Sequence, residues 1–143
     1  MKKNLLKNFV FIILTTVLIS LTTTSDAQIR YTDFETIEDV KIEYRWQRSN
    51  IFKSETRTIL NLRIENTNDY PIKINFAVGF YEAGKLVYKS EDMEKCFEAG
   101  ERKRGGLADL RFQCTELTRN AIESEDFDWE FIHFNVEQTD ECP

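Results

Sequence analysis

The chain has 143 residues, of which 41% are hydrophobic and 13% aromatic, and it carries a formal net charge of −6. This length and composition support a folded domain with a substantial core. The acidic balance argues against binding to nucleic acid or to anionic lipid, because both ligands require basic groups that neutralise phosphates.

The first 27 residues have the form of a secretory signal peptide. Three lysines precede an apolar stretch at 9–21, and the polar segment that follows ends in Ser25 and Ala27. Small residues at these positions are read by signal peptidase, so we expect cleavage after Ala27 and export to the periplasm or the cell exterior. A membrane anchor is the alternative, but this apolar run is shorter than the roughly 20 residues that cross a bilayer.

Residues 28–143 are expected to form one exported domain. Its net charge is −8, because the signal segment removes three lysines and one aspartate. Apolar and polar residues alternate at 40–47, 59–64 and 72–80, which predicts strands with one buried and one wet face. The dipeptide at Ala83-Gly84 predicts a hairpin turn into a short strand.

Two further strands are predicted at 93–98 and 107–114, with the basic segment 101–106 as the turn between them. The polar segment 115–127 then predicts a connection with one helical turn. In the last strand, 127–136, the apolar parity changes, and a β-bulge between Phe131 and Ile132 would restore one inward face. A strand buried on both faces is the alternative. Together these elements predict an all-β fold, an immunoglobulin-like antiparallel β-sandwich of about seven strands.

The three cysteines, Cys96, Cys114 and Cys142, permit a disulfide in an exported protein. Cys114 lies on the apolar face of its predicted strand and is expected to point inward. Cys96 and Cys114 are symmetric about Gly105-Gly106, so a hairpin at that dipeptide would place them opposite each other. The first-choice disulfide is therefore Cys96–Cys114, and a pairing of Cys142 with one of these two is the alternative.

The segment at 65–69 raises the question of a metal site, because four of its five side chains, those of Glu65, Asn66, Asn68 and Asp69, offer oxygens suited to a cation. A calcium loop also needs a glycine at the sharp bend and a closing acid, whereas here Pro71 fixes the backbone. Asparagine and aspartate bond their own backbone in turns. We therefore predict a turn between two core strands and no metal or cofactor site.

The remaining polar groups give no catalytic constellation. The only histidine, His133, has no second histidine beside it for metal binding, and a cysteine nucleophile would lack an orienting group. The basic run at 102–104 is expected to be a solvated hairpin tip, with anion binding as its alternative. The acids at 123–128 are too weakly patterned to indicate glycosidase chemistry. We expect no catalytic residues and no enzyme.

The run from Leu62 to Glu91 resembles small secreted immunoglobulin-like domains of the FxLYD type. Val78, Phe80, Tyr81 and Glu82 stand where that motif has Phe, Leu, Tyr and Asp, and Gly84-Lys85 follow as in the family. The resemblance implies an extracytoplasmic β-sandwich without known catalytic residues.

The functional expectation is an exported, non-enzymatic binding or accessory module of the cell envelope. Its partner would be a protein, which could add to a sheet edge or bind a loop end. A small secreted acidic inhibitor of a hydrolase is the alternative, suggested by the acidity and a stapled loop. Neither expectation includes nucleic acid or a membrane span after cleavage.

Overall fold

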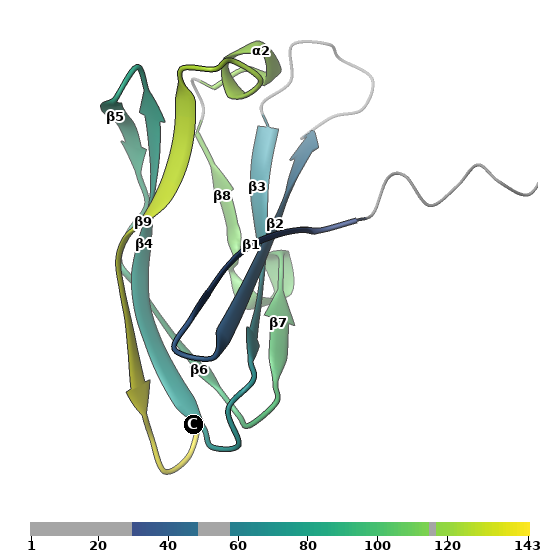
Figure 1. Cartoon of the computed structure of the whole chain (residues 1–143), viewed down its shortest axis with the longest axis vertical. Coiled ribbons are helices and arrows are strands. Elements are labelled where there is room, and N and C mark those ends of the chain that lie inside the picture. Colours follow the sequence, from purple (N-terminus) through teal and green to yellow (C-terminus); the bar gives the residue numbers. More distant parts are fainter. Residues whose placement is uncertain (1–29, 49–57, 115–116) are drawn as a thin grey trace, which may run out of the picture. The chain divides into compact units, whose positions relative to one another are not determined.

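The alternating residues fold into two antiparallel sheets in the computed structural model, which describes residues 30–48, 58–114 and 117–143 (Figure 1). Tyr31–Pro143 form one unit. The predicted signal segment lies outside the described residues. Within the described ranges, no helix is long and apolar enough to cross a membrane.

The first sheet is built around β3, which pairs with β2 on one side and with two short strands on the other. β1 completes it by pairing with the free side of β2. Its strands are β1 (Thr32–Ile37), β2 (Val40–Arg48), β3 (Thr58–Asn66), β7 (Arg102–Arg104) and β8 (Arg111–Gln113), and the 3-10 turn η2 (Gly106–Ala108) separates the last two.

The second sheet is built around β4, which β9 follows along its whole length on one side. β5 and β6 share the other side of β4. The bounds are β4 (Ile72–Glu82), β5 (Lys85–Lys89), β6 (Met93–Phe97) and β9 (Phe127–Gln138). Figure 1 shows β4 and β9 side by side, across from β2, β3 and β8. The all-β sandwich prediction is confirmed, while the immunoglobulin-like topology stays a prediction.

The core lies between the two sheets and is made by the predicted inward positions. Their side chains are fully buried in the central strands, namely Val40, Ile42, Leu60, Leu62, Ile64, Ile72, Ile74, Phe76, Val78 and Phe80. Tyr44 and Trp46, also predicted to face inward, are partly buried and pack against this core. Period-two alternation therefore identified the inward face. Several outward positions are buried as well, among them Glu43, Ile59, Asn61 and Ala77.

Two tight turns set the registers of the hairpins. Ala83 and Gly84 have positive φ values of 48° and 74° and connect β4 to β5, which confirms the predicted hairpin. Glu38 and Asp39 do the same between β1 and β2, with φ values of 48° and 59°. Positive φ at both central residues matches the right-handed twist of the flanking strands. The predicted helical turn is confirmed as α2 (Arg119–Ile122).

The predicted bulge in β9 is present, one residue later than expected. Phe76 pairs with Phe134 and the next residue, Ala77, pairs with Ile132, so His133 is the extra residue, with a φ of 49°. The shift returns both halves of the strand to one inward face, because Phe131 and Phe134 then lie opposite Val78 and Phe76. The alternative, a strand buried on both faces, does not agree with the exposed residues that recur along β9.

The prediction of a basic hairpin tip at 102–104 is wrong. Arg102–Arg104 form β7 and pair with β3 instead of turning back on β6. The chain crosses from the second sheet to the first at a tight turn, where Glu101 donates its backbone N–H to Glu98 and Gly100 has a φ of 68°. The predicted strand at 107–114 is accordingly shorter, since only Arg111–Gln113 pair as β8.

Candidate functional site

Five arginines lie on the outer face of the first sheet. One of them, Arg102, lies opposite Glu65, and the other four lie in the two neighbouring rows. Strand pairing sets six polar residues in two adjacent rows across this face, Glu43–Arg63–Arg104 and Arg45–Asn61–Arg111. Neighbouring strands lie about 4.8 Å apart, so the outer members of each row are separated by about 10 Å. We call Arg45, Arg63, Arg104 and Arg111 the arginine face.

One member of the arginine face is held in an internal ion pair. Glu43 is only 6% exposed and accepts hydrogen bonds from Nε of Arg63 and, at 2.5 Å, from its Nη2. Lys41 lies 3.5 Å from the same carboxylate and 3.0 Å from Asp33. The hydrogen bonds from Arg63 hold the pKa of Glu43 below its ordinary value, against the opposing effect of burial.

The other three arginines have no carboxylate partner within the described part of the chain. Arg45 lies over the Tyr31 ring at 4.9 Å, and its Nε is buried without a hydrogen-bond partner there. Arg104 is exposed and stands directly opposite Arg63, an unfavourable pairing of like charges. The guanidinium groups of Arg104 and Arg111, which are both exposed, are therefore available for an external anion.

The arginine face continues into an open depression at the edge of the sheet. Ile59, Gly106, Asp109, Arg111 and Gln113 line it. A Cβ built on Gly106 would lie 3.0 Å from Cδ of Arg111, so the stem of this arginine rests against the glycine backbone. The absence of a side chain at Gly106 thus determines where the Arg111 guanidinium lies.

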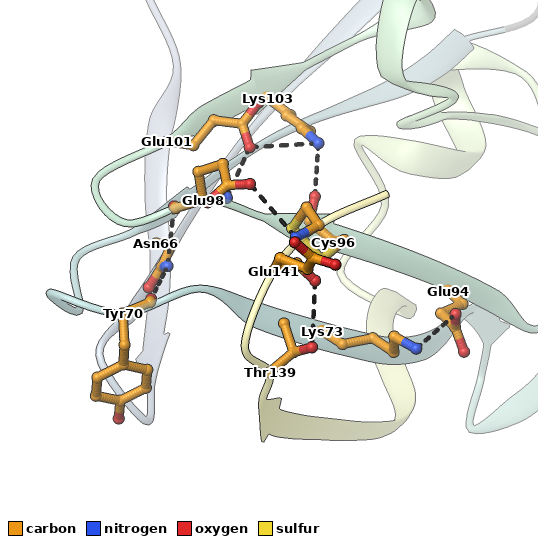
Figure 2. Close-up of a disulfide and its surroundings, with 11 residues drawn as sticks. Asn66, Tyr70, Lys73, Glu94, Cys96, Glu98, Glu101, Lys103, Thr139 and Glu141 are labelled. Atoms are coloured by element: carbon orange, nitrogen blue, oxygen red, sulfur yellow. Dashed lines mark hydrogen bonds and ion pairs between the residues drawn. A yellow bond between two sulfur atoms is a disulfide. The ribbon is translucent and has the colours of Figure 1, made fainter.

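The segment at 65–69, whose side chains raised the question of a metal site, is confirmed as a turn. It connects β3 of the first sheet to β4 of the second. Asn66 is fully buried, and its Nδ2 donates to the backbone oxygens of Tyr70 at 2.8 Å and Glu98 at 3.0 Å (Figure 2). Its Oδ1 accepts from both the backbone and side-chain nitrogens of Asn68. Both Nδ2 and Oδ1 of Asn66 are therefore hydrogen-bonded within the protein.

Neighbouring residues fasten the same turn to the β1–β2 hairpin. Thr67 donates through its backbone N–H and its hydroxyl to the oxygen of Asp39, at 2.9 and 2.6 Å. Asn68 donates to the oxygen of Glu38 at 3.2 Å. No group of three metal-ligating side chains occurs within the residues that the structure describes. The β3–β4 turn is thus hydrogen-bonded to two other connections, the β1–β2 hairpin and the turn that follows β6.

The disulfide joins Cys96 to Cys142, so the first-choice pairing with Cys114 is wrong and the alternative is correct. Cys96 lies in the second sheet and the strand before Cys114 lies in the first, so no hairpin sets them opposite each other. Cys114 is free and buried, which confirms its inward orientation. The physical reason is the sheet crossing after β6, which symmetry about Gly105-Gly106 could not reveal.

The bond fixes the C-terminal tail across the end of β4. Beyond β9, Thr139 donates its N–H to the oxygen of Pro71, and the chain continues to the β6 side, where Cys142 meets Cys96. Nζ of Lys103 donates to the oxygen of Cys96 at 2.5 Å (Figure 2). The tail, the turn at Asn66 and β7 are thus fastened at one end of the sandwich.

The basic run, the histidine and the acids are not brought together. Arg102 pairs with Glu65 at 2.5 Å and Lys103 lies over the Phe97 ring, so only Arg104 of this run is left unpaired within the described residues. His133 lies at the β9 bulge, 3.5 Å from Asp92. The four acids considered for hydrolysis are exposed around the start of β9, namely Glu123, Glu125, Asp126 and Asp128.

Comparisons of this chain with protein-family models, with curated proteins and with solved structures find no match.

Replacing Glu43 with glutamine is expected to lower the free energy of unfolding by about 1–3 kcal/mol, because Arg63 loses a charged hydrogen-bond partner in a largely buried place. The pKa of Glu43 is lowered in the folded protein, so its stabilising contribution is present above the ordinary value of 4.5 and is lost as the pH falls through the lowered value. Urea denaturation at pH 7 and at pH 3 measures both effects.

The control for this variant is Glu35→Gln, which removes an exposed carboxylate with no ion pair within the described residues. We expect the Glu43→Gln protein to lose less stability than the wild type on acidification, and the control to follow the wild type. Equal acid sensitivity of all three proteins would contradict the assigned role of Glu43.

Replacing Gly105 with alanine is expected to cost about 1–3 kcal/mol, because its φ of 55° and ψ of −147° are open in practice only to glycine. No clash contributes, since the nearest atom to the added Cβ would be Oδ1 of Asn61 at 3.8 Å. Gly106→Ala is the matched variant, since it only displaces the flexible stem of Arg111. Thermal unfolding should therefore separate the two, and an equal Tm would contradict the strain at Gly105.

Proposed function

We propose that the protein is an exported, non-enzymatic binding or accessory module of the cell envelope, and that it meets a protein partner through the arginine face. The observation that carries the proposal is a set of arginines without a carboxylate partner in the described chain, Arg45, Arg104 and Arg111, in a domain whose net charge is otherwise strongly negative. Arginine presents a planar fork that matches carboxylates, and it is enriched at protein interfaces.

The edges of the sheets are poor candidates for the contact. β1, β5 and β9 each pair with one strand within the described chain, and each contains a register shift, with Phe34, Val87 and His133 as the extra residues. The other edge strands, β6, β7 and β8, have no such shift but are only 5, 3 and 3 residues long. A bulged edge strand twists away from the geometry that a further strand needs. Two binding modes were expected from the sequence, addition to an edge strand and binding at a loop end. Docking on the arginine face is a third mode, and it has more support than addition to an edge strand.

The charge distribution favours one orientation of an acidic partner relative to this protein. An acidic partner surface is repelled by most of the protein and attracted to the arginine face, and such complementarity orients the encounter. Long anionic polymers such as nucleic acid are disfavoured, because the remaining acidic surface would repel their phosphates.

The alternative function, a hydrolase inhibitor, has lost one of its supports. It was suggested by acidity together with a stapled loop, whereas the disulfide fastens the C-terminal tail to β6. Acidity alone does not distinguish an inhibitor from any soluble domain.

The proposal is tested by affinity purification of the tagged protein from its native cells after mild chemical crosslinking. The expected result is an envelope protein recovered with it in a fixed ratio. Localisation of the protein to the cytoplasm, or its recovery without any partner under crosslinking, would contradict the proposal.

A further inference from the structure

Leu107 is the most exposed large apolar side chain of the described residues, and it lies between two members of the arginine face. Its exposed fraction is 105%, against 49% for Leu86 and 38% for Val87 on the second sheet. It belongs to η2, three residues after Arg104 and four before Arg111. A leucine that protrudes completely has no role in the core of the protein.

The turn that carries Leu107 is fastened at its base. Gly105 donates to the oxygen of Leu62 at 3.0 Å, Leu62 donates to Leu110 at 2.9 Å, and Leu110 donates back to Gly105 at 2.9 Å. Leu110 is fully buried below the turn. Because the backbone is already fixed, a partner that binds Leu107 does not have to order this segment.

The far side of the turn is tied to the second sheet. Asp109 has a left-handed conformation, with a φ of 54°, and its carboxylate lies 3.2 Å from Nζ of Lys95 in β6. Its charge is therefore partly neutralised by that lysine. Arg104 and Arg111 stand at the two ends of the turn, where each pairs with β3, and neither has a carboxylate partner in the described chain.

We propose that Leu107, flanked by Arg104 and Arg111, is the anchor of a protein–protein contact. The partner presents an apolar pocket for the leucine, and carboxylates at the rim of this pocket bind the two arginines. The inference rests on the proposed function and specifies the partner's surface. An apolar anchor surrounded by polar and charged contacts is the usual composition of an interface centre.

A protein pocket explains the cluster better than the other anionic ligands do. An acidic glycan would use the arginines but offers no apolar pocket in which a leucine side chain gains by leaving water. An anionic membrane would meet a single leucine and a domain of net charge −8, which gives neither enough apolar area nor enough positive charge for binding.

The test uses a photo-crosslinking amino acid at Gln113, which is exposed and lines the depression beside Leu107. A second protein carries the same group at Lys85, which is exposed on β5 of the second sheet. Both are expressed in the native cells. We expect a crosslinked product from position 113, with the attached partner peptide lying beside Asp or Glu residues, and a far weaker product from position 85.

The decisive comparison adds Leu107→Ser to the protein with the probe at 113, and Leu86→Ser as the matched loss of an exposed leucine. Leu107→Ser should lower the yield of product at least tenfold, and Leu86→Ser should leave it unchanged. An unchanged yield with Leu107→Ser, or product only from position 85, overturns the inference while the proposed function stands. Absence of product at both positions overturns the inference and counts against the function as well.

Two further measurements separate the other ligand classes. Purified protein is mixed with vesicles of phosphatidylglycerol and, separately, with polygalacturonate at physiological salt. We expect no binding to either that depends on Leu107. Binding to the vesicles that Leu107→Ser abolishes, or loss of the crosslinked product when polygalacturonate competes, would overturn the protein pocket as the occupant.

Discussion

Replacing Cys142 with serine lowers the free energy of unfolding by about 4 kcal/mol, the largest effect expected from a single substitution discussed for this protein. The disulfide to Cys96 closes a loop with a sequence separation of 46 residues. A bond that closes a loop of this size restricts the unfolded chain by about that amount in the chain-entropy model. Without the bond, the tail also loses its attachment across the end of β4.

Urea denaturation with and without a reducing agent measures this effect. The wild type should lose about as much stability on reduction as it loses on the substitution, and the Cys142→Ser protein should not respond to the reductant. Cys114→Ala is the control, because Cys114 is buried but unbonded, and its variant should keep the full response to reduction. A wild-type protein whose stability is the same with and without reductant would contradict the bond.

Replacing Asn66 with aspartate lowers the free energy of unfolding by about 2–4 kcal/mol. The new oxygen takes the place of Nδ2, so it faces the backbone oxygens of Tyr70 and Glu98 instead of donating to them. The site is fully buried, so water cannot replace the lost donors, and the carboxylate loses its hydration as well.

Asn68→Asp is the matched control, because Asn68 has the same chemistry two residues away but is not buried. We expect it to cost less than about 1 kcal/mol, since a partly exposed group can exchange its partners for water. Thermal and urea unfolding of the two variants make the comparison. Equal stabilities would mean that the corner is not held by the Asn66 amide.

The sequence predicted the core because every second residue of β2, β3 and β4 is apolar and faces the other sheet. The structure buries most of these residues, and it also buries some outward positions, such as Glu43, Asn61 and Ala77. The edges were harder to predict. β1 contains no alternation of this kind. Its contacts with the core come from Ile37 and from the bulged Phe34, which stacks on Trp129 with 4.3 Å between ring centroids. β1 is a strand because it pairs with β2, and its own residues do not alternate between apolar and polar. Such a strand cannot be predicted from alternation in the sequence.

The candidate site was only partly visible for a related reason. Alternation already assigns Arg45 and Arg63 to the outer face of their strands. Arg104 was assigned to a hairpin tip, because a basic run beside two glycines is typical of a turn. In the structure Arg104 belongs to β7, which pairs with β3, and the ion pair between Glu65 and Arg102 joins the same two strands. The arginines are brought together by strand pairing between segments that are far apart in the sequence, which alternation within one strand does not reveal.

Leu107 was assigned to a strand, and its protrusion could not be predicted from its neighbours. Its exposure depends on the conformation of Gly105 and on the hydrogen bonds that close η2 against β3. One signal was present in the sequence, the pair Gly105-Gly106 directly before an apolar residue. Glycine at such a place allows a backbone conformation that interrupts a strand, and here it does so between β7 and β8.

The central claim, that the arginine face is the functional surface, is tested most directly by charge reversal. One protein carries Arg45, Arg104 and Arg111 changed to glutamate, and the matched control carries the same change at Lys73, Lys85 and Lys89 of the second sheet. The two proteins have equal net charge. After crosslinking in native cells, we predict that the arginine variant recovers the partner at least tenfold less than the wild type while the lysine variant recovers it normally. Equal recovery by the two variants would contradict the claim.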